Sequence, residues 1–104
     1  MAYIRLTDQG FTVERDLHVL FAARWEEITR VAGYKKDCIT VDQIRFVVSD
    51  GAYEIELTED MQGWRELVAA LPERVIGFPM ESEWFPKLAQ PPFATNFTIL
   101  FEKL

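Results

Sequence analysis

Four acidic residues gather near the middle of the chain and are the first candidates for chemistry: Glu54, Glu56, Glu59 and Asp60. Alternate residues of a strand share one face, so Glu54 and Glu56 are expected about 7 Å apart on a strand. Paired carboxylates act as general acid and base in glycosidases, but that reaction needs a sugar cleft and one carboxyl group with a raised pKa. No flanking residue indicates burial. The pattern favours a solvated face, and the alternative is a docking surface for a basic partner.

The chain contains one histidine, His18, and one cysteine, Cys38. The imidazole is a possible general base, and the thiol, beside Lys35 and Lys36, a possible nucleophile. No local signature supports a Cys–His dyad, and no nucleophile is placed beside His18, so both residues are interpreted as structural. One cysteine excludes an internal disulfide, and one cysteine with one histidine excludes the usual zinc ligand sets.

A short polar connection holds Asp37, Thr40 and Asp42. A calcium loop supplies oxygen ligands at regular spacing, which this segment lacks. Asp and Thr side chains commonly bind nearby backbone N–H groups in turns, and we predict that role. The sequence also has no glycine-rich phosphate loop and no G-x-S-x-G or H-E-x-x-H motif. We therefore expect no catalytic residue, no metal and no other cofactor.

Two adjacent aromatic residues, Trp84 and Phe85, lie in a proline-rich stretch that hydropathy periods cannot assign. Aromatic side chains are enriched at binding surfaces, so five aromatic residues are candidates to line a groove or an interface: Trp25, Trp64, Trp84, Phe85 and Phe93. The pair is therefore a candidate for an exposed contact or for the wall of a ligand groove. Trp64, by contrast, lies on an apolar helical stripe and is expected in the core.

The 104 residues include 17 acidic and 11 basic ones, for a net charge of −6. The excess lies in residues 46–104, because residues 1–45 hold equal numbers of both signs. Nucleic-acid binders usually carry a basic excess, and an anionic membrane repels an acidic chain. The composition argues against both partners.

The apolar content of 49% indicates a packed core, and the length fits a single domain over residues 1–104. No apolar run approaches the roughly 20 residues that span a bilayer. The first residues lack the basic and apolar regions of a secretory signal. We expect a cytoplasmic protein that is not an integral membrane protein.

A β-hairpin is the clearest predicted element. Ile44, Phe46 and Val48 alternate on one face of residues 43–49, and Asp50-Gly51 is a strong hairpin turn signal. The returning strand, residues 52–57, alternates too, which predicts Tyr53, Ile55 and Leu57 on the inner face. This pattern is typical of an antiparallel sheet with one solvated side.

One main helix is predicted over residues 60–71. Met61, Trp64, Val68 and Leu71 recur at helical spacing, and Pro72 is expected to end the helix. The acidic Glu59 and Asp60 would favour a helix N-terminus.

The N-terminal third allows two interpretations. Leu17, Phe21, Trp25 and Ile28 recur at helical spacing. The alternative is a pair of short strands near residues 10–14 and 18–24, a turn at Trp25, and a strand over residues 28–34. Periodicity favours the helix, and β-branched content favours the strands.

The C-terminal part contains four prolines after residue 78, which exclude a long regular helix there. Residues 82–85 are expected to form one helical turn. Residues 96–102 are predicted to form a final strand, with Phe97, Ile99 and Phe101 on its inner face.

Four segments resemble a group of small, mostly uncharacterised bacterial single-domain proteins: 25–37 (WEEITRVAGYKKD), 40–44 (TVDQI), 59–64 (EDMQGW) and 92–96 (PFATN). The resemblance covers nearly the whole chain. In its order of elements it is similar to bacterial pleckstrin-homology-like domains, which have a strongly bent antiparallel sheet, a partly open barrel, with a helix packed on it. It implies strands in the N-terminal third and brings no activity. Where pleckstrin-homology domains use a basic loop to bind phosphoinositides, residues 13–18 read VERDLH, with no basic cluster.

The sequence thus predicts an α+β domain, a bent antiparallel sheet with one main helix at residues 60–71. Its leading function is a non-catalytic intracellular interaction module, for example a small acidic immunity-type protein that binds a basic partner through Glu54, Glu56, Glu59 and Asp60. The alternatives are a small-molecule or peptide binder at Trp84-Phe85 and, less favoured, an enzyme using His18 or Cys38. A homodimer through the C-terminal strand or the aromatic tail is a further expectation.

Overall fold

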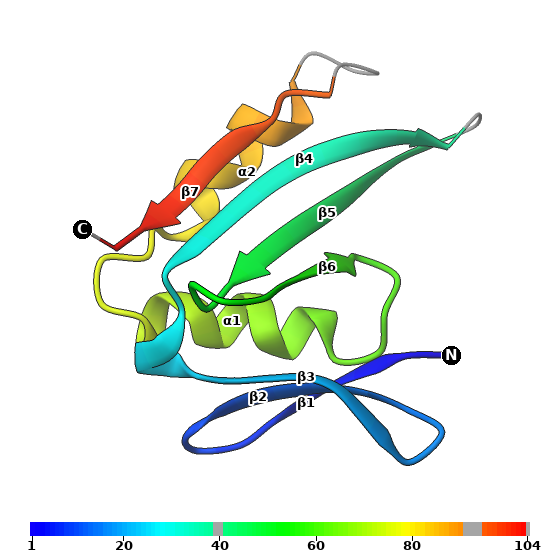
Figure 1. The fold of residues 1–104 in the computed structure, drawn as a ribbon. Helices are drawn as coiled ribbons and strands as arrows, with labels where there is room; N and C mark the ends of the chain where they lie inside the picture. The colour runs from blue at the N-terminus through cyan, green and yellow to red at the C-terminus, as the bar shows by residue number, and fades with distance from the viewer. Residues whose placement is uncertain (39–40, 91–94, 104) are drawn as a thin grey trace.

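The computed structural model describes residues 1–38, 41–90 and 95–103, which form two antiparallel sheets and two helices (Figure 1). The smaller sheet has the order β1-β2-β3. Its strands are β1 (Tyr3–Leu6), β2 (Gly10–Arg15) and β3 (His18–Arg24). The strands predicted near residues 10–14 and 18–24 are thus confirmed, and β1 was not predicted.

The larger sheet has the order β6-β5-β4-β7, so the last strand of the chain pairs with β4. Its strands are β4 (Arg30–Cys38), β5 (Val41–Ser49), β6 (Glu54–Thr58) and β7 (Thr98–Glu102). A short 3₁₀ helix, η1 (Trp25–Glu27), connects β3 of the smaller sheet to β4 of the larger one.

The helix α1 (Trp64–Arg74) differs from its prediction at both ends. It begins later than residue 60, because Gly63 has a φ of +94° and so interrupts a right-handed helix. It also continues past Pro72, which lies in its last turn. A proline there removes one backbone donor, and the helix ends two residues later, where Val75 N–H bonds the Leu71 carbonyl at 2.9 Å.

A second helix, α2 (Glu81–Ala89), replaces the single helical turn expected at residues 82–85, so the prediction of one main helix is wrong. It contains Pro86 and packs on β4 at Gly33. A Cβ atom at Gly33 would lie 2.7 Å from Leu88 Cδ1. The missing side chain therefore lets the helix approach the sheet closely.

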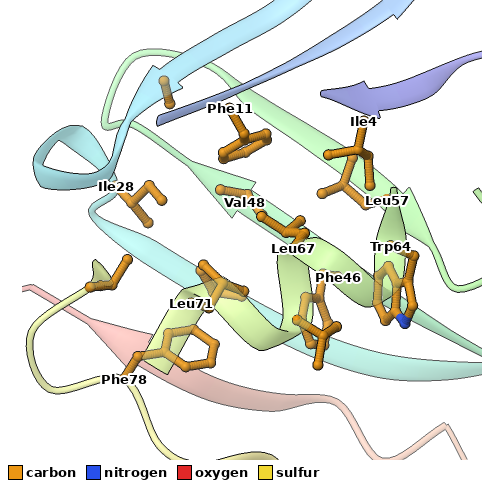
Figure 2. Packing of buried hydrophobic residues seen from close by; sticks show 14 of the residues in the cluster. Ile4, Phe11, Ile28, Phe46, Val48, Leu57, Trp64, Leu67, Leu71 and Phe78 are labelled. Carbon is orange, nitrogen blue, oxygen red and sulfur yellow. The ribbon is translucent and has the colours of Figure 1, made fainter. Parts of the chain in front are cut away.

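A continuous cluster of buried side chains joins both sheets and both helices (Figure 2). Phe46 lies at its centre, with ring centroids 4.6 Å from Trp64 of α1 and 5.1 Å from Trp84 of α2. From the smaller sheet, Ile4 and Phe11 join the same cluster. Burial of this apolar surface is the main stabilising contribution to the fold.

The predicted α+β class with antiparallel strands is confirmed. The described strands form two sheets that do not close into a barrel, so the finer expectation of one bent, barrel-like sheet is not shown by this arrangement. Separately, none of the described helices has the length and apolar character needed to cross a membrane.

The hairpin faces are largely as predicted, since Ile44, Phe46, Val48 and Leu57 are buried. Tyr53 is 74% exposed, because it lies in the turn before β6 begins, so its predicted inward position is wrong.

The inner face predicted for the last strand is also wrong for two of its three residues. Phe97 and Ile99 are exposed, whereas Phe101 is partly buried. A register shift opposite Val31 and Ala32 reverses the alternation, so that Leu100 also packs against the core.

Candidate functional site

The acidic strand surface, defined as Glu54, Glu56, Glu59 and Asp60, lies along β6 and the turn that follows it. Each carboxylate has a partner. Glu54 pairs with Arg30 at 3.5 Å, and Glu56 pairs with Arg45 at 3.0 Å. Glu59 Oε1 accepts a hydrogen bond from Ile44 N–H at 2.9 Å.

Two hydroxyl groups complete the pairing of this surface. Asp60 accepts a hydrogen bond from Thr58, and Glu56 accepts a second one, from the Tyr34 hydroxyl. The hydrogen bond to the Glu56 carboxylate, followed by desolvation, raises the pKa of Tyr34 above its ordinary value. The carboxylates of the acidic strand surface are therefore already paired within the chain. A hollow of about 400 Å³ lies beside Glu54, between β3 and the turn after β5.

Trp84 and Phe85, predicted as an exposed aromatic pair, point to different faces of α2, with ring centroids 6.1 Å apart. Trp84 is 2% exposed and belongs to the core, so its expected role as an exposed contact is wrong. A helix of period 3.6 turns consecutive residues to different faces, which explains the separation. Phe85 is exposed and lines a hollow of about 510 Å³ with Arg65, Glu81 and Ser82. The hypothesis of a ligand groove there stays a prediction.

The two candidate catalytic residues are not brought together by any described contact. His18 is exposed at the start of β3, and the side chain of Cys38 lies outside the described part of the chain. Across the described residues, no group of three or more His, Cys, Asp or Glu side chains is arranged to hold a metal ion.

The largest cleft described lies elsewhere, between η1, the connection from α1 to α2, and β7. It has a volume of about 830 Å³, and we call it the Trp25 cleft. Its apolar lining consists of Trp25, Ile28, Val75, Ile76, Leu100 and Phe101. Its charged rim consists of Glu26, Glu73, Arg74, Glu102 and Lys103. Concave apolar surfaces with a few polar groups at the edge are the usual form of binding sites.

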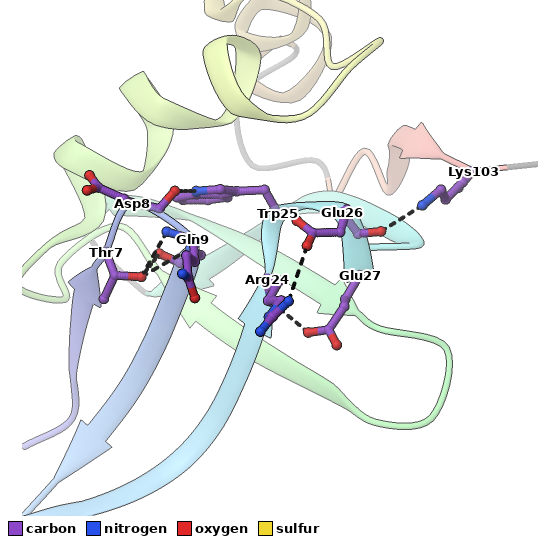
Figure 3. A network of polar contacts seen from close by, with 9 residues as sticks. Thr7, Asp8, Gln9, Arg24, Trp25, Glu26, Glu27 and Lys103 are labelled. Atoms are coloured by element: carbon purple, nitrogen blue, oxygen red, sulfur yellow. Dashed lines mark hydrogen bonds and ion pairs between the residues drawn. The ribbon is translucent and has the colours of Figure 1, made fainter.

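Trp25 is held in place by the smaller sheet (Figure 3). Its indole Nε1–H donates to the Asp8 carbonyl at 3.2 Å, and its backbone N–H donates to the Gln9 carbonyl at 3.0 Å. Its ring also packs against Phe11, with centroids 6.0 Å apart. Because Trp25 is anchored at both ends and largely buried, it gives the cleft a rigid wall.

The turn that carries Asp8 is itself stabilised by local hydrogen bonds. The Thr7 hydroxyl accepts from Gln9 N–H at 3.3 Å and from Gly10 N–H at 3.1 Å (Figure 3). The η1 turn is similarly fixed, because Arg24 N–H donates to Glu27 Oε1 at 2.8 Å. Two ordered turns therefore position the tryptophan before any ligand is bound.

The rim is electrostatically uneven. Lys103 Nζ donates to the Glu26 carbonyl at 2.6 Å, and Arg74 donates to the Asp8 carbonyl at 3.4 Å, so both cations bind backbone oxygens. The side chains of Glu73 and Glu102 have no hydrogen bond or ion pair within the described chain. Their charge is therefore directed to solvent or to a ligand.

A neighbouring hollow of about 450 Å³ shares Trp25, Glu73 and Arg74 with the cleft and continues along α1 past Glu66 towards Asp8. Together the two hollows extend an apolar groove with further carboxylates on its edge. This shape suits an extended ligand better than a compact one.

Sequence reasoning named Trp25 only as one of several aromatic residues that could line a groove, among them Phe93, which lies outside the described residues, and it did not predict this site. Its walls come from residues 25–28, 73–77 and 100–103, which no motif links. One sequence signal was available. Ile76 is an aliphatic residue that follows the apolar stripe of α1 but does not continue its spacing, and in the structure its side chain is 96% exposed.

Comparison of the chain with models of protein families, with curated proteins and with solved structures finds no match.

Proposed function

We propose that this protein is a non-catalytic interaction module that binds a short segment of a partner protein in the Trp25 cleft. The segment carries an apolar residue that enters the cleft and basic residues that face its rim. The observation that carries this proposal is the combination of an apolar lining with unpaired carboxylates at the edge.

Ile76 provides the apolar contribution to binding. A side chain that is 96% exposed contributes little to the core, yet it lies beside the partly buried Phe101 in the largest cleft described. Covering both by a ligand removes apolar surface from water, at roughly 25 cal/mol per Å². This term favours a ligand with an aliphatic or aromatic anchor.

Glu73 and Glu102 provide the electrostatic contribution to binding. Because the cations of the rim already bind backbone oxygens, an arriving ammonium or guanidinium group would find these carboxylates unpaired. The net charge of −6 adds long-range attraction for a basic partner. A basic, apolar segment is thus complementary in both respects, whereas an acidic one is repelled.

The proposed class, a non-catalytic interaction module, is the one predicted from the sequence. The proposed binding site is the Trp25 cleft instead of the acidic strand surface. A cytoplasmic protein of the small acidic immunity type, which neutralises a basic partner without chemistry, is the form we propose. We also propose that the two sheets and α1 represent an opened pleckstrin-homology-like architecture, related to the small bacterial proteins that the sequence resembles. The hairpin order and the helix after β6 support it.

The test is selection of a random peptide library displayed on phage against the purified chain. Enriched peptides are expected to contain Lys or Arg beside an apolar residue. A synthetic peptide of that sequence is then added to isotope-labelled protein, and the three tryptophan indole signals are followed by NMR. The Trp25 signal is expected to shift, while those of the buried Trp64 and Trp84 serve as internal references.

Matched variants locate the binding site. Ile76→Asp is expected to weaken the peptide at least tenfold, and Leu17→Asp is expected to leave it unchanged, although both residues are almost fully exposed aliphatics (96% and 97%). Glu73→Lys combined with Glu102→Lys should weaken binding by a similar factor and reduce its salt dependence. Failure to enrich any peptide, or shifts confined to residues 54–60, would overturn the assignment to this cleft.

A further inference from the structure

The outer face of the larger sheet is a second surface with unusual properties. Both helices pack on the opposite, inner face, where Trp64 and Trp84 contact Phe46. The strand registers place Ile99, Ala32 and Val47 in one row across the outer face, and Tyr34 and Arg45 in the next. The described helices therefore leave this face open.

An apolar strip occupies the β7 side of this face. Phe97 is 61% exposed and Ile99 is 47% exposed, and the Phe97 ring lies 6.3 Å from that of Tyr34. Ala32, between Ile99 and Val47 in the row, is buried by its longer neighbours. Phe97, Ile99 and the ring of Tyr34 thus form a small apolar strip on a face that no described helix covers.

The charges of the outer face cancel, unlike those of the chain as a whole. Arg30 pairs with Glu54, and Arg45 pairs with Glu56. The two further charges that the registers place on this face, Lys36 and Glu102, are of opposite sign, so its formal charges sum to zero. Two copies of a chain with a net charge of −6 repel each other over most of their surfaces. Because the outer face is close to neutral, repulsion between two copies is smallest there. A strongly basic partner would also gain the least electrostatic attraction at this face. The charge pattern therefore selects a second copy as the occupant.

β7 is an edge strand of the larger sheet, and the register shift opposite Val31 and Ala32 is a feature that limits pairing of another strand at such an edge. β7 pairs on one side with β4, and its central residues, Ile99, Leu100 and Phe101, carry no charge and no proline. Natural edge strands commonly carry lysine, proline or a cover when they must stay unpaired. The face of the sheet at β7, rather than its edge, is therefore the open surface, because the side chains of Ile99 and the preceding Phe97 are exposed there.

We propose that two copies of this chain pack the outer faces of their larger sheets together about a two-fold axis, with Phe97 and Ile99 at the centre. Face-to-face sheets lie about 10 Å apart, a spacing that side chains of this size fill. A two-fold interface uses the same patch on both copies, so this neutral apolar strip is complementary to itself. The Trp25 cleft plays no part in this contact, and the inference does not depend on the proposed function.

The experiment is sedimentation velocity of the full chain across micromolar to millimolar concentrations. A monomer–dimer equilibrium is expected. Ile99→Lys and Phe97→Lys should each raise the dimer dissociation constant at least tenfold, and Leu17→Lys, on the exposed turn between β2 and β3, should not change it. Phe97 precedes β7, so its variant tests the contact without altering the strand, and circular dichroism verifies that each variant is folded.

Salt separates this inference from the proposed function. The dimer is expected to tighten with added salt, because screening reduces repulsion between two acidic chains. Binding of a basic peptide is expected to weaken under the same change. A chain that stays monomeric throughout, or a dimer that Ile99→Lys leaves intact, overturns the inference, whatever the peptide experiment shows.

Discussion

The acidic strand surface and the rim of the Trp25 cleft present the same chemical group in different surroundings. On β6, Glu54 and Glu56 face Arg30 and Arg45 across neighbouring strands. At the cleft, Glu73 has no such partner in the described chain, because the nearby Arg74 donates to a backbone carbonyl instead. A dense run of acids in the sequence is thus less informative about a binding site than the pairing of each carboxylate in the fold.

The two regions also differ in the size and lining of the hollow beside their carboxylates. The hollow beside Glu54 has about half the volume of the Trp25 cleft, at about 400 against about 830 Å³. Below the cleft rim lies a tryptophan fixed by two hydrogen bonds. Substitutions in the two regions should therefore have very different costs, and this difference can be measured.

The largest effect is expected at the cleft wall. Trp25→Ala removes a buried ring that packs on Phe11 and deletes the hydrogen bond to the Asp8 carbonyl. Loss of a buried aromatic typically lowers the free energy of unfolding by about 3–5 kcal/mol. Chemical denaturation followed by circular dichroism measures it. As a control, Trp25→Phe keeps most of the ring and should lose far less; a near-neutral Trp25→Ala would show that the wall is not part of the core.

A smaller effect is expected on the acidic strand surface. Arg45→Met and Glu56→Gln, alone and together, form a double-mutant cycle for the 3.0 Å ion pair. Partly exposed pairs couple by about 0.2–1 kcal/mol. The coupling should shrink in high salt. A coupling energy of zero would mean that the Arg45–Glu56 ion pair does not form in solution, and the comparison between the two regions would lose its strongest example.

The smallest effect concerns Asp50, in the turn before β6. Its carboxylate accepts the N–H groups of Tyr53 and Ala52 at 2.8 and 2.9 Å, and these hydrogen bonds lower its pKa below the ordinary 3.8. Since the folded state holds the proton less tightly, the stabilisation is complete above pH 3.8 and is lost as pH falls through the lowered pKa.

The variant Asp50→Asn keeps one acceptor oxygen and removes the titration. Its stability should therefore fall less than that of the unmodified chain on going from about pH 5 to about pH 2, as thermal melts at several pH values would show. Identical pH profiles would mean that the turn does not favour the charged form of Asp50.

Local sequence signals predicted the parts of the fold that local interactions decide. The Asp50-Gly51 turn and the alternation of Ile44, Phe46 and Val48 give the β5–β6 hairpin, because a two-residue period and a turn suffice to specify it. The strands β2 and β3 follow from the same kind of pattern, although helical spacing competed with it there.

The errors arose where tertiary packing outweighs local preference. Pro72 and Pro86 both lie inside helices, because buried neighbours such as Leu71 and Leu88 hold those turns against the core. Trp84 was assigned to the surface since no period was visible around it. One missing backbone donor costs less than the apolar burial that these helices gain.

The Trp25 cleft was beyond the reach of sequence patterns, because it depends on three segments that meet after folding. Nothing in the type or spacing of Trp25, Ile76 and Phe101 indicates that they share a wall. The acidic strand surface was recognised as a cluster, but its ion pairs depend on the register of β4, β5 and β6.

The position of β7 has a consequence for the order of folding. Val31 pairs with Phe101, and Thr29 accepts a hydrogen bond from Lys103, so the second edge of β4 is occupied only after residues 98–103 have been made. During synthesis, the smaller sheet and the β4–β5 hairpin can form from nearby residues, whereas this pairing closes a long loop and is slow. Until then a nascent chain leaves β4 with an open edge, which makes chains interrupted before residue 98 the species most prone to aggregate.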